Sequence, residues 1–176
     1  MSERPGTEPH RRYDTFFSPE AVSDISSAMN SILADVFSLL VKTKNFHWHV
    51  SGPHFHDYHR LLDNQAQQLF LAVDGMATRV RKIGGTTIRS LGHIASLTQI
   101  RDNDEAAVPA SVMLAELCAD NAALAERMRQ THSLCDEHGD IASAGLLEGW
   151  IDEAEQRIWF LSEIGNDIPL PSRAAE

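Results

Sequence analysis

Two histidines and two aspartates in the first half of the chain are spaced as metal ligands on helices. His59 and Asp63 are four residues apart, so one helix face presents both, and His47 precedes them across a Ser-Gly-Pro segment. Asp74 follows Asp63 by eleven residues, which returns it to within about 20° of that face but roughly 16 Å further along the axis. One chain therefore cannot close the site. If two copies pack antiparallel about a two-fold axis, Asp74 of one copy lies beside His59 and Asp63 of the other, so the spacing predicts two equivalent metal sites at a dimer interface.

Length and composition restrict the class of protein. The 176 residues suffice for one domain with a single core. The chain is 43% hydrophobic, yet no apolar run approaches the length of about 18 residues that a membrane span requires. The polar start of the chain lacks the apolar region of a signal peptide. Its two cysteines, Cys118 and Cys135, would be roughly 25 Å apart on one helix, too far for a disulfide. These features predict a cytoplasmic protein without a membrane segment.

The formal net charge of -10 opposes contact with DNA or an anionic membrane. Three arginines near the N-terminus do not form a basic arm, because three nearby carboxylates offset them. These residues are Arg4, Arg11 and Arg12, and Glu3, Glu8 and Asp14. An acidic surface concentrates cations, which suits a protein whose substrate is a divalent metal ion.

Four long stretches carry apolar residues at helical spacing, and no stretch alternates with the period of a half-buried strand, so the predicted fold class is all-α. Ser18 as N-cap and Pro19 after it mark the start of the first helix. The four expected helices run from Ser18 to the turn at residues 51–53, from about His54 to Ile83, from near Pro109 to just before Gly139, and from there to Gly165. Gly84 and Gly85 are the expected stop of the second helix, and Gly165 is the expected stop of the fourth.

The links between these helices predict their connectivity. Short links make the first two helices, and likewise the last two, antiparallel neighbours, whereas about 25 residues separate the second from the third. A four-helix bundle with one long crossover is the ferritin-like arrangement. The crossover contains an apolar stretch, residues 89–97, that predicts a short extra helix. We expect residues 18–165 to form this bundle between flexible tails, 1–17 and 166–176.

The sequence also excludes one kind of metal site. Di-iron proteins with the site inside the bundle use a Glu followed three residues later by His on two helices. No Glu in this chain has His at that offset. The metal site is therefore expected at a subunit interface rather than in the bundle core.

The chain resembles the Dps family, the DNA-binding proteins from starved cells or mini-ferritins. The resemblance spans about residues 18–165 and rests on HWHVSGPHFHDYHRLLD, the aspartate eleven residues later, RVRKIGGTTIRSLGHI and the late WFL. It implies a hollow shell of twelve subunits with iron sites at two-fold interfaces. Such a shell oxidises Fe(II), commonly with hydrogen peroxide, and stores the ferric product, which protects against oxidative damage.

The resemblance also assigns the ligands. His47, His59 and Asp63 match the ligands from one subunit, and Asp74 matches the first carboxylate from its partner. Thr78 stands where the family has a second partner carboxylate, a glutamate, so iron binding is expected to be weaker. Two imidazoles and two carboxylates can bind one Fe(II) but also suit tetrahedral zinc. The sequence is compatible with a mono-iron site, a di-iron site or a zinc site.

Other residues near the motif have two interpretations. His49, His54 and His56 are expected on the surface, with His56 the best placed to assist. Trp48 and Trp159 resemble the family's aromatic residues near the oxidation centre, which could absorb stray oxidising equivalents, but both could equally fill gaps between helices.

Three acidic residues mark the turn between the third and fourth long helices. Asp136, Glu137 and Asp140 lie where the family has acidic pores that could draw iron inward, although a solvated helix end explains them almost as well.

These patterns support two functions. The first is a ferroxidase that oxidises Fe(II) at inter-subunit sites and stores iron. The alternative is a shell of the same architecture whose oxidation centre is impaired by Thr78 and which sequesters metal passively or compacts DNA in the nucleoid. The DNA-binding form of this alternative is disfavoured by the negative charge. An unrelated bundle with incidental histidines is the least favoured interpretation.

Overall fold

A computed structural model describes residues 15–166, and this part of the chain contains five α-helices and no strand. The all-α prediction is therefore confirmed. The helices are α1 (Pro19–His49), α2 (Phe55–Lys82), α3 (Leu91–Leu97), α4 (Ala110–Glu137) and α5 (Ile141–Asn166). The predicted tails, 1–17 and 166–176, lie outside the described residues except for residues 15–17 and 166.

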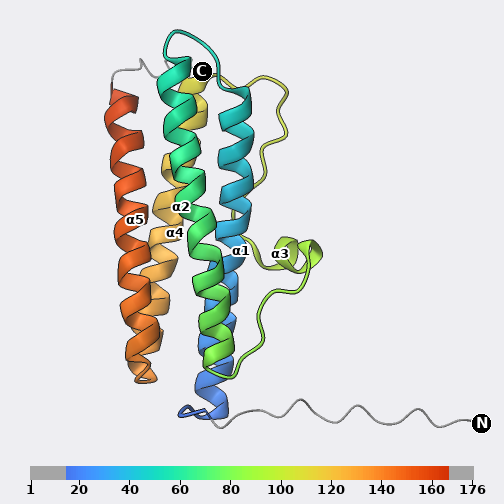
Figure 1. Ribbon diagram of the computed structural model, residues 1–176, viewed down its shortest axis with the longest axis vertical. Coiled ribbons are helices and arrows are strands. Elements are labelled where there is room, and N and C mark those ends of the chain that lie inside the picture. The colour runs from blue at the N-terminus through green and yellow to red at the C-terminus, as the bar shows by residue number, and fades with distance from the viewer. Residues whose placement is uncertain (1–14, 167–176) are drawn as a thin grey trace, which may run out of the picture.

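The four long helices form two antiparallel hairpins that lie side by side (Figure 1). The helices α1 and α2 pack against each other, as do α4 and α5, and the hairpins meet where α1 packs on α4 and α2 on α5. The short α3 lies in the crossover between the hairpins and packs on α1. This is the predicted ferritin-like bundle with an additional short helix.

The helix ends follow their sequence signals with one exception. The Ser18 hydroxyl accepts a hydrogen bond from the Ala21 amide at 3.2 Å, which caps α1 as predicted. Gly84 ends α2 with a φ of 95°, a left-handed conformation that costs glycine little. The prediction that Gly165 stops the last helix is wrong, since α5 continues to Asn166, and one helical glycine costs only about 1 kcal/mol.

Gly85 permits a close approach between α1 and the end of α2. A Cβ atom at this position would lie 1.9 Å from the Ser26 hydroxyl oxygen and 2.9 Å from the Ser26 Cβ of α1, so a larger residue would require Ser26 or one of the two segments to shift. The Gly-Gly pair therefore both ends α2 and seats its end against α1.

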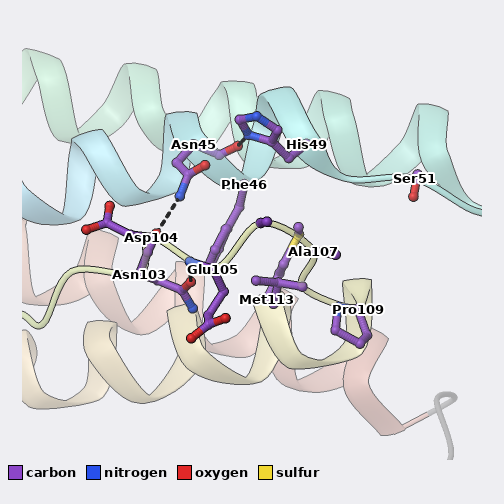
Figure 2. A pocket seen from close by; sticks show the side chains of 12 residues that line it. Asn45, Phe46, His49, Ser51, Asn103, Asp104, Glu105, Ala107, Pro109 and Met113 are labelled. Atoms are coloured by element: carbon purple, nitrogen blue, oxygen red, sulfur yellow. Dashed lines mark hydrogen bonds between the residues drawn. The ribbon is translucent and has the colours of Figure 1, made fainter.

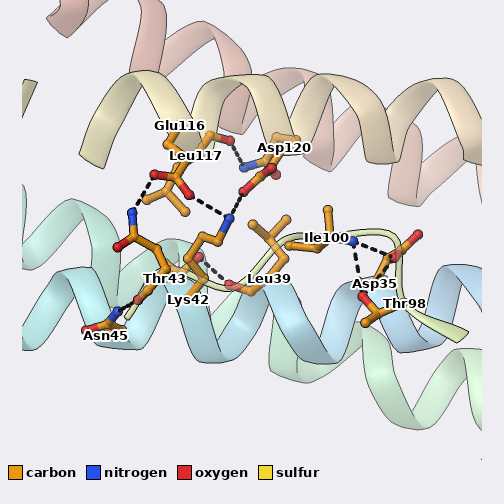
Figure 3. A network of polar contacts seen from close by, with 12 residues as sticks. Asp35, Leu39, Lys42, Thr43, Asn45, Thr98, Ile100, Glu116, Leu117 and Asp120 are labelled. Atoms are coloured by element: carbon orange, nitrogen blue, oxygen red, sulfur yellow. Dashed lines mark hydrogen bonds and ion pairs between the residues drawn. The ribbon is translucent and has the colours of Figure 1, made fainter. Parts of the chain in front are cut away.

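A fully buried carboxylate ties the crossover to the bundle. Asp35 of α1 accepts hydrogen bonds from the Thr98 hydroxyl (3.0 Å) and the Gln99 and Ile100 amides (2.6 and 3.3 Å), as Figure 3 shows in part. It also pairs with the Arg127 guanidinium of α4 at 2.7 Å. Because these partners satisfy the buried charge, Asp35 fixes the crossover against both hairpins.

A second buried charge joins the hairpins directly. Lys42 of α1 donates to Glu116 (2.8 Å) and Asp120 (2.7 Å) of α4 (Figure 3). Burial lowers the pKa of Lys42, but its hydrogen bonds to Asp120 and Glu116 outweigh that effect, so the pKa is raised overall. The lysine therefore stays charged inside the bundle.

The helix α1 qualifies the prediction of no membrane segment. Among the described helices it alone is long and apolar enough to cross a membrane, with an 18-residue window of mean hydropathy 1.3. Half of that window is buried inside the bundle. Core helices of bundles pass the same test, so this is weak evidence for a membrane span.

Candidate metal site

The hairpin of α1 and α2 brings two of the predicted ligands into contact. His47 lies in the last turn of α1 and is buried, and His59 lies in the second turn of α2 and is half-buried. Their imidazole rings stack with centroids 3.7 Å apart and an interplanar angle of 23°. Two of the predicted ligands, His47 and His59, thus lie against each other within one chain.

Two reciprocal hydrogen bonds orient these rings. The Nδ1 of His47 lies 2.8 Å from the His59 carbonyl oxygen, and the Nδ1 of His59 lies 2.8 Å from the His47 carbonyl oxygen. A carbonyl oxygen only accepts hydrogen bonds, so each Nδ1 carries the proton. In the neutral imidazole the lone pair is then on Nε2, which is the arrangement of histidines that bind metals.

Asp63 lies beside this pair and is held by a lysine. Its Oδ1 is 4.0 Å from His47 Nε2 and 2.8 Å from Lys44 Nζ, and its Oδ2 accepts a hydrogen bond from Gln67 at 3.3 Å. The hydrogen bond from Lys44 is the largest influence on this carboxyl and lowers its pKa, with smaller contributions from the two imidazoles. Asp63 is therefore ionised at neutral pH and available as an anionic ligand.

Lys44 is the residue that sequence reasoning missed. It lies three residues before His47 on α1, so helical spacing alone places its side chain on the same face. A metal ion that binds Asp63 Oδ1 must displace the Lys44 ammonium.

Asp74 and Thr78 lie further along α2. Asp74 is exposed and Thr78 is half-buried. Within the described part of a single chain, no three His, Cys, Asp or Glu side chains converge closely enough to hold an ion. That Asp74 of a second copy completes the site stays a prediction.

The face of α1 and α2 beside Asp63 carries exposed apolar side chains. Val41 is 64% exposed, Phe70 65% and Leu71 75%. A groove of about 320 Å³ runs along this face. Its lining residues are Leu40, Lys44, Ala66, Gln67, Phe70 and Leu71. A contiguous apolar surface on a small protein often marks a protein interface.

The remaining histidines of the motif are exposed, as predicted. His49 donates from Nδ1 to the Asn45 carbonyl oxygen at 2.8 Å and lines a separate pocket of about 700 Å³, whose floor includes Phe46 (Figure 2). His54 contacts Tyr58, and His56 lies 3.7 Å from Asp57.

Trp48 and Trp159 do not fill buried gaps within the chain. Trp48 is 63% exposed, and Trp159 is 56% exposed and stacks on Phe160 at 5.1 Å. The gap-filling alternative is therefore wrong for a single chain.

Asp140 fits neither predicted role of the acidic turn, the acidic pore or the solvated helix end. It is 1% exposed, pairs with Arg79 of α2, and accepts hydrogen bonds from the Ser143 amide (3.0 Å) and hydroxyl (2.5 Å). It therefore caps the start of α5 inside the bundle, whereas Asp136 and Glu137 are exposed.

The fold and the family comparison define the class of the protein. The family model described as Ferritin-like domain matches residues 26–170. Among solved structures, DpsC from Streptomyces coelicolor superposes with a TM-score of 0.86 at 24% identity, covering 92% of this chain and 94% of that chain. Antigen TpF1 from Treponema pallidum superposes with a TM-score of 0.80 at 25% identity, covering 90% and 98%.

Sequence relatives narrow this class. A DNA protection during starvation protein of Agrobacterium fabrum is 30% identical over 141 residues, which are 80% of this chain and 87% of the relative. An uncharacterized low temperature-induced protein of Nostoc sp. is 32% identical over 147 residues, or 83% and 82%. The chain belongs to the Dps family of the ferritin-like superfamily.

Proposed function

We propose that this protein oxidises Fe(II) at sites between subunits and stores the Fe(III) product, with His47, His59 and Asp63 from one chain and Asp74 from a second copy as ligands. The observation that carries the proposal is the pair of reciprocal hydrogen bonds that leaves both Nε2 atoms free for metal beside an ionised Asp63. Family membership supports iron as the metal.

The exposed apolar face of α1 and α2 supports assembly at this site. A second copy packed antiparallel there would cover Phe70 and Leu71 and bring its own Asp74 toward the ligands. We further propose that such dimers build a twelve-subunit shell in the cytoplasm. Sedimentation velocity should then detect one large particle, and a monomer at micromolar concentration would contradict the site.

In this reaction the chain binds Fe(II) and positions it for the oxidant. Each Fe(II) gives up one electron, and one hydrogen peroxide takes two electrons and two protons to form two waters. The imidazoles and carboxylates hold Fe(II) in place, and the negative charge of Asp63 and Asp74 stabilises the Fe(III) product. Open coordination positions admit the oxidant.

Stopped-flow oxidation of Fe(II) by peroxide tests this function. The wild-type protein should accelerate oxidation over buffer, and His47→Ala should abolish most of that acceleration. The matched control is His49→Ala, since His49 also bonds a carbonyl oxygen through Nδ1 and lies on the same helix, but it is exposed and lines a separate pocket. Equal rates with and without protein would end the enzymatic proposal.

A second candidate function rests on two observations. Lys44 occupies Asp63 Oδ1, and Thr78 offers a neutral hydroxyl where the resemblance implies a carboxylate. Both weaken the site, so the shell could instead sequester iron or zinc without oxidising it. Tight metal binding with no acceleration of oxidation would favour this candidate.

DNA binding is the less favoured part of that candidate. The net charge of -10 per chain opposes contact with phosphates. Gel retardation at low salt, with the full chain and with residues 1–16 removed, tests it.

A further inference from the structure

Three of the four long helices place a polar side chain in the apolar centre of the bundle. Gln65 of α2 is 3% exposed, Asn121 of α4 is 1% exposed and Arg157 of α5 is 2% exposed. Their neighbours on the same helix faces are core residues, namely Leu62, Leu69, Leu117, Leu124, Ala154 and Leu161.

Contacts between the helices bring these polar groups to one level of the bundle. Arg157 Nε donates a hydrogen bond to Asn121 Oδ1 at 2.7 Å. Gln68 of α2 donates to Gln156 of α5 at 3.2 Å, and the two helices run antiparallel (Figure 1). Gln65 therefore lies within about 3 Å of Arg157 along the bundle axis.

The positive charge of Arg157 has no counter-charge in contact with it. Its hydrogen bond is to a neutral amide, and among residues 15–166 no carboxylate forms an ion pair with it, whereas Arg79, Arg127 and Arg129 are all paired. Burial lowers the pKa of Arg157 to about 10, and the charge of Glu153, one turn earlier on α5, opposes this only in part. The guanidinium is thus charged at neutral pH, and a buried charge is unfavourable unless it is paired.

Gln65 has an unsatisfied side-chain amide. Its Oε1 and Nε2 are both buried, and neither has a hydrogen-bond partner within the described part of the chain. Because Gln65 shares a helix face with Leu62 and Leu69, this amide is directed into the bundle. Buried amides in native proteins are almost always hydrogen-bonded, so an unpaired one indicates a bound molecule or ion.

A small anion satisfies both residues. The guanidinium and the Gln65 Nε2 are donors, and an anion accepts from both. A water molecule would bond Gln65 but leave the charge of Arg157 unbalanced, and a cation would be repelled by that charge. Asn121 has both of its amide atoms engaged, since its Nδ2 donates to the Leu117 carbonyl oxygen at 2.8 Å, so it holds the guanidinium in place.

We propose that each bundle binds one small inorganic anion, such as chloride, between Arg157 and Gln65. The anion balances the buried charge and satisfies the buried amide. Because the unfolded chain has no such site, the anion stabilises the folded bundle increasingly as its concentration rises. The site lies within one chain and uses none of the four ligands of the inter-subunit site.

Thermal unfolding of the full-length protein tests the proposal in sodium chloride and in sodium gluconate of equal ionic strength. Gluconate is too large for a buried site, so the wild type should unfold at a higher temperature in chloride, by a margin that grows with concentration. Arg157→Met removes the charge and should abolish this margin, and Gln65→Leu should reduce it. Arg129→Gln is the matched control, because it removes an exposed arginine that is paired with Glu155 and should keep the full margin.

Equal unfolding temperatures of the wild type in the two salts would overturn the anion site, as would the same margin in Arg157→Met. A wild-type crystal grown in sodium bromide should have an anomalous peak beside Arg157, and this measurement decides the matter if Arg157→Met fails to fold. No peak, with Glu153 turned onto the guanidinium, would show that the chain supplies the counter-charge itself and would refute the proposal. None of these measurements involves iron, so failure of the inter-subunit site is distinguishable from failure of this one.

Discussion

Replacing Lys44 by Met is expected to strengthen metal binding at the inter-subunit site. The Lys44 ammonium lies 2.8 Å from Asp63 Oδ1, and a metal that takes this oxygen must displace it. The two side chains are 32% and 37% exposed, so breaking their ion pair costs at most about 1 kcal/mol. Methionine keeps most of the side-chain packing and removes the charge.

Displacement of the ammonium sets the size of the expected gain. Because a metal no longer has to break this ion pair in Lys44→Met, its affinity should rise by at most about 1 kcal/mol, or about fivefold.

Calorimetric titration with Zn²⁺ measures this gain. Arg89→Gln is the control, since it also removes one exposed positive charge but lies beyond the opposite end of α2. An unchanged affinity in Lys44→Met, or an equal gain in both variants, would refute the argument that Lys44 competes locally for Asp63.

Three further predictions concern single residues. Thr78→Glu should tighten Zn²⁺ and Fe(II) binding about tenfold or more in the same titration, whereas the neutral Thr78→Gln should not. Lys42→Met should lower the free energy of unfolding in urea by about 3 kcal/mol, because it leaves Glu116 and Asp120 without their cation. The raised pKa of Lys42 means that the wild type keeps this stabilisation below the ordinary lysine pKa and loses it as the pH rises through the raised value. Burial, followed by the charge of Asp140, raises the pKa of Cys135 to about 11, so this thiol should react with a disulfide reagent at pH 8 only after unfolding.

The fold was predictable because its signals are local. Helical periodicity, the Ser18 cap and the Gly84 stop each act within a few residues, and each has the predicted role in the structure. The prediction that the last helix stops at Gly165 was wrong because the local cost of one glycine is smaller than the gain from continuing a packed helix.

The candidate site was predictable to the level of a helix face. The four-residue spacing of His59 and Asp63 placed them together, and the short turn placed His47 opposite. The reciprocal bonds between the two histidines and the pair between Lys44 and Asp63 were not predicted, because they depend on the register of α1 against α2.

The sequence by itself determined the helices, their order and the residue types on each face, since these follow from periodicities of a few residues. Only the tertiary structure decided which charges meet. Asp140, expected at an acidic surface, is buried against Arg79, and His132 lies between carboxylates of α4 and α5. The physical reason is that a side-chain contact between helices depends on the axial register and rotation of those helices. Many packed residues each contribute a little to this register, and no short motif is sufficient to set it.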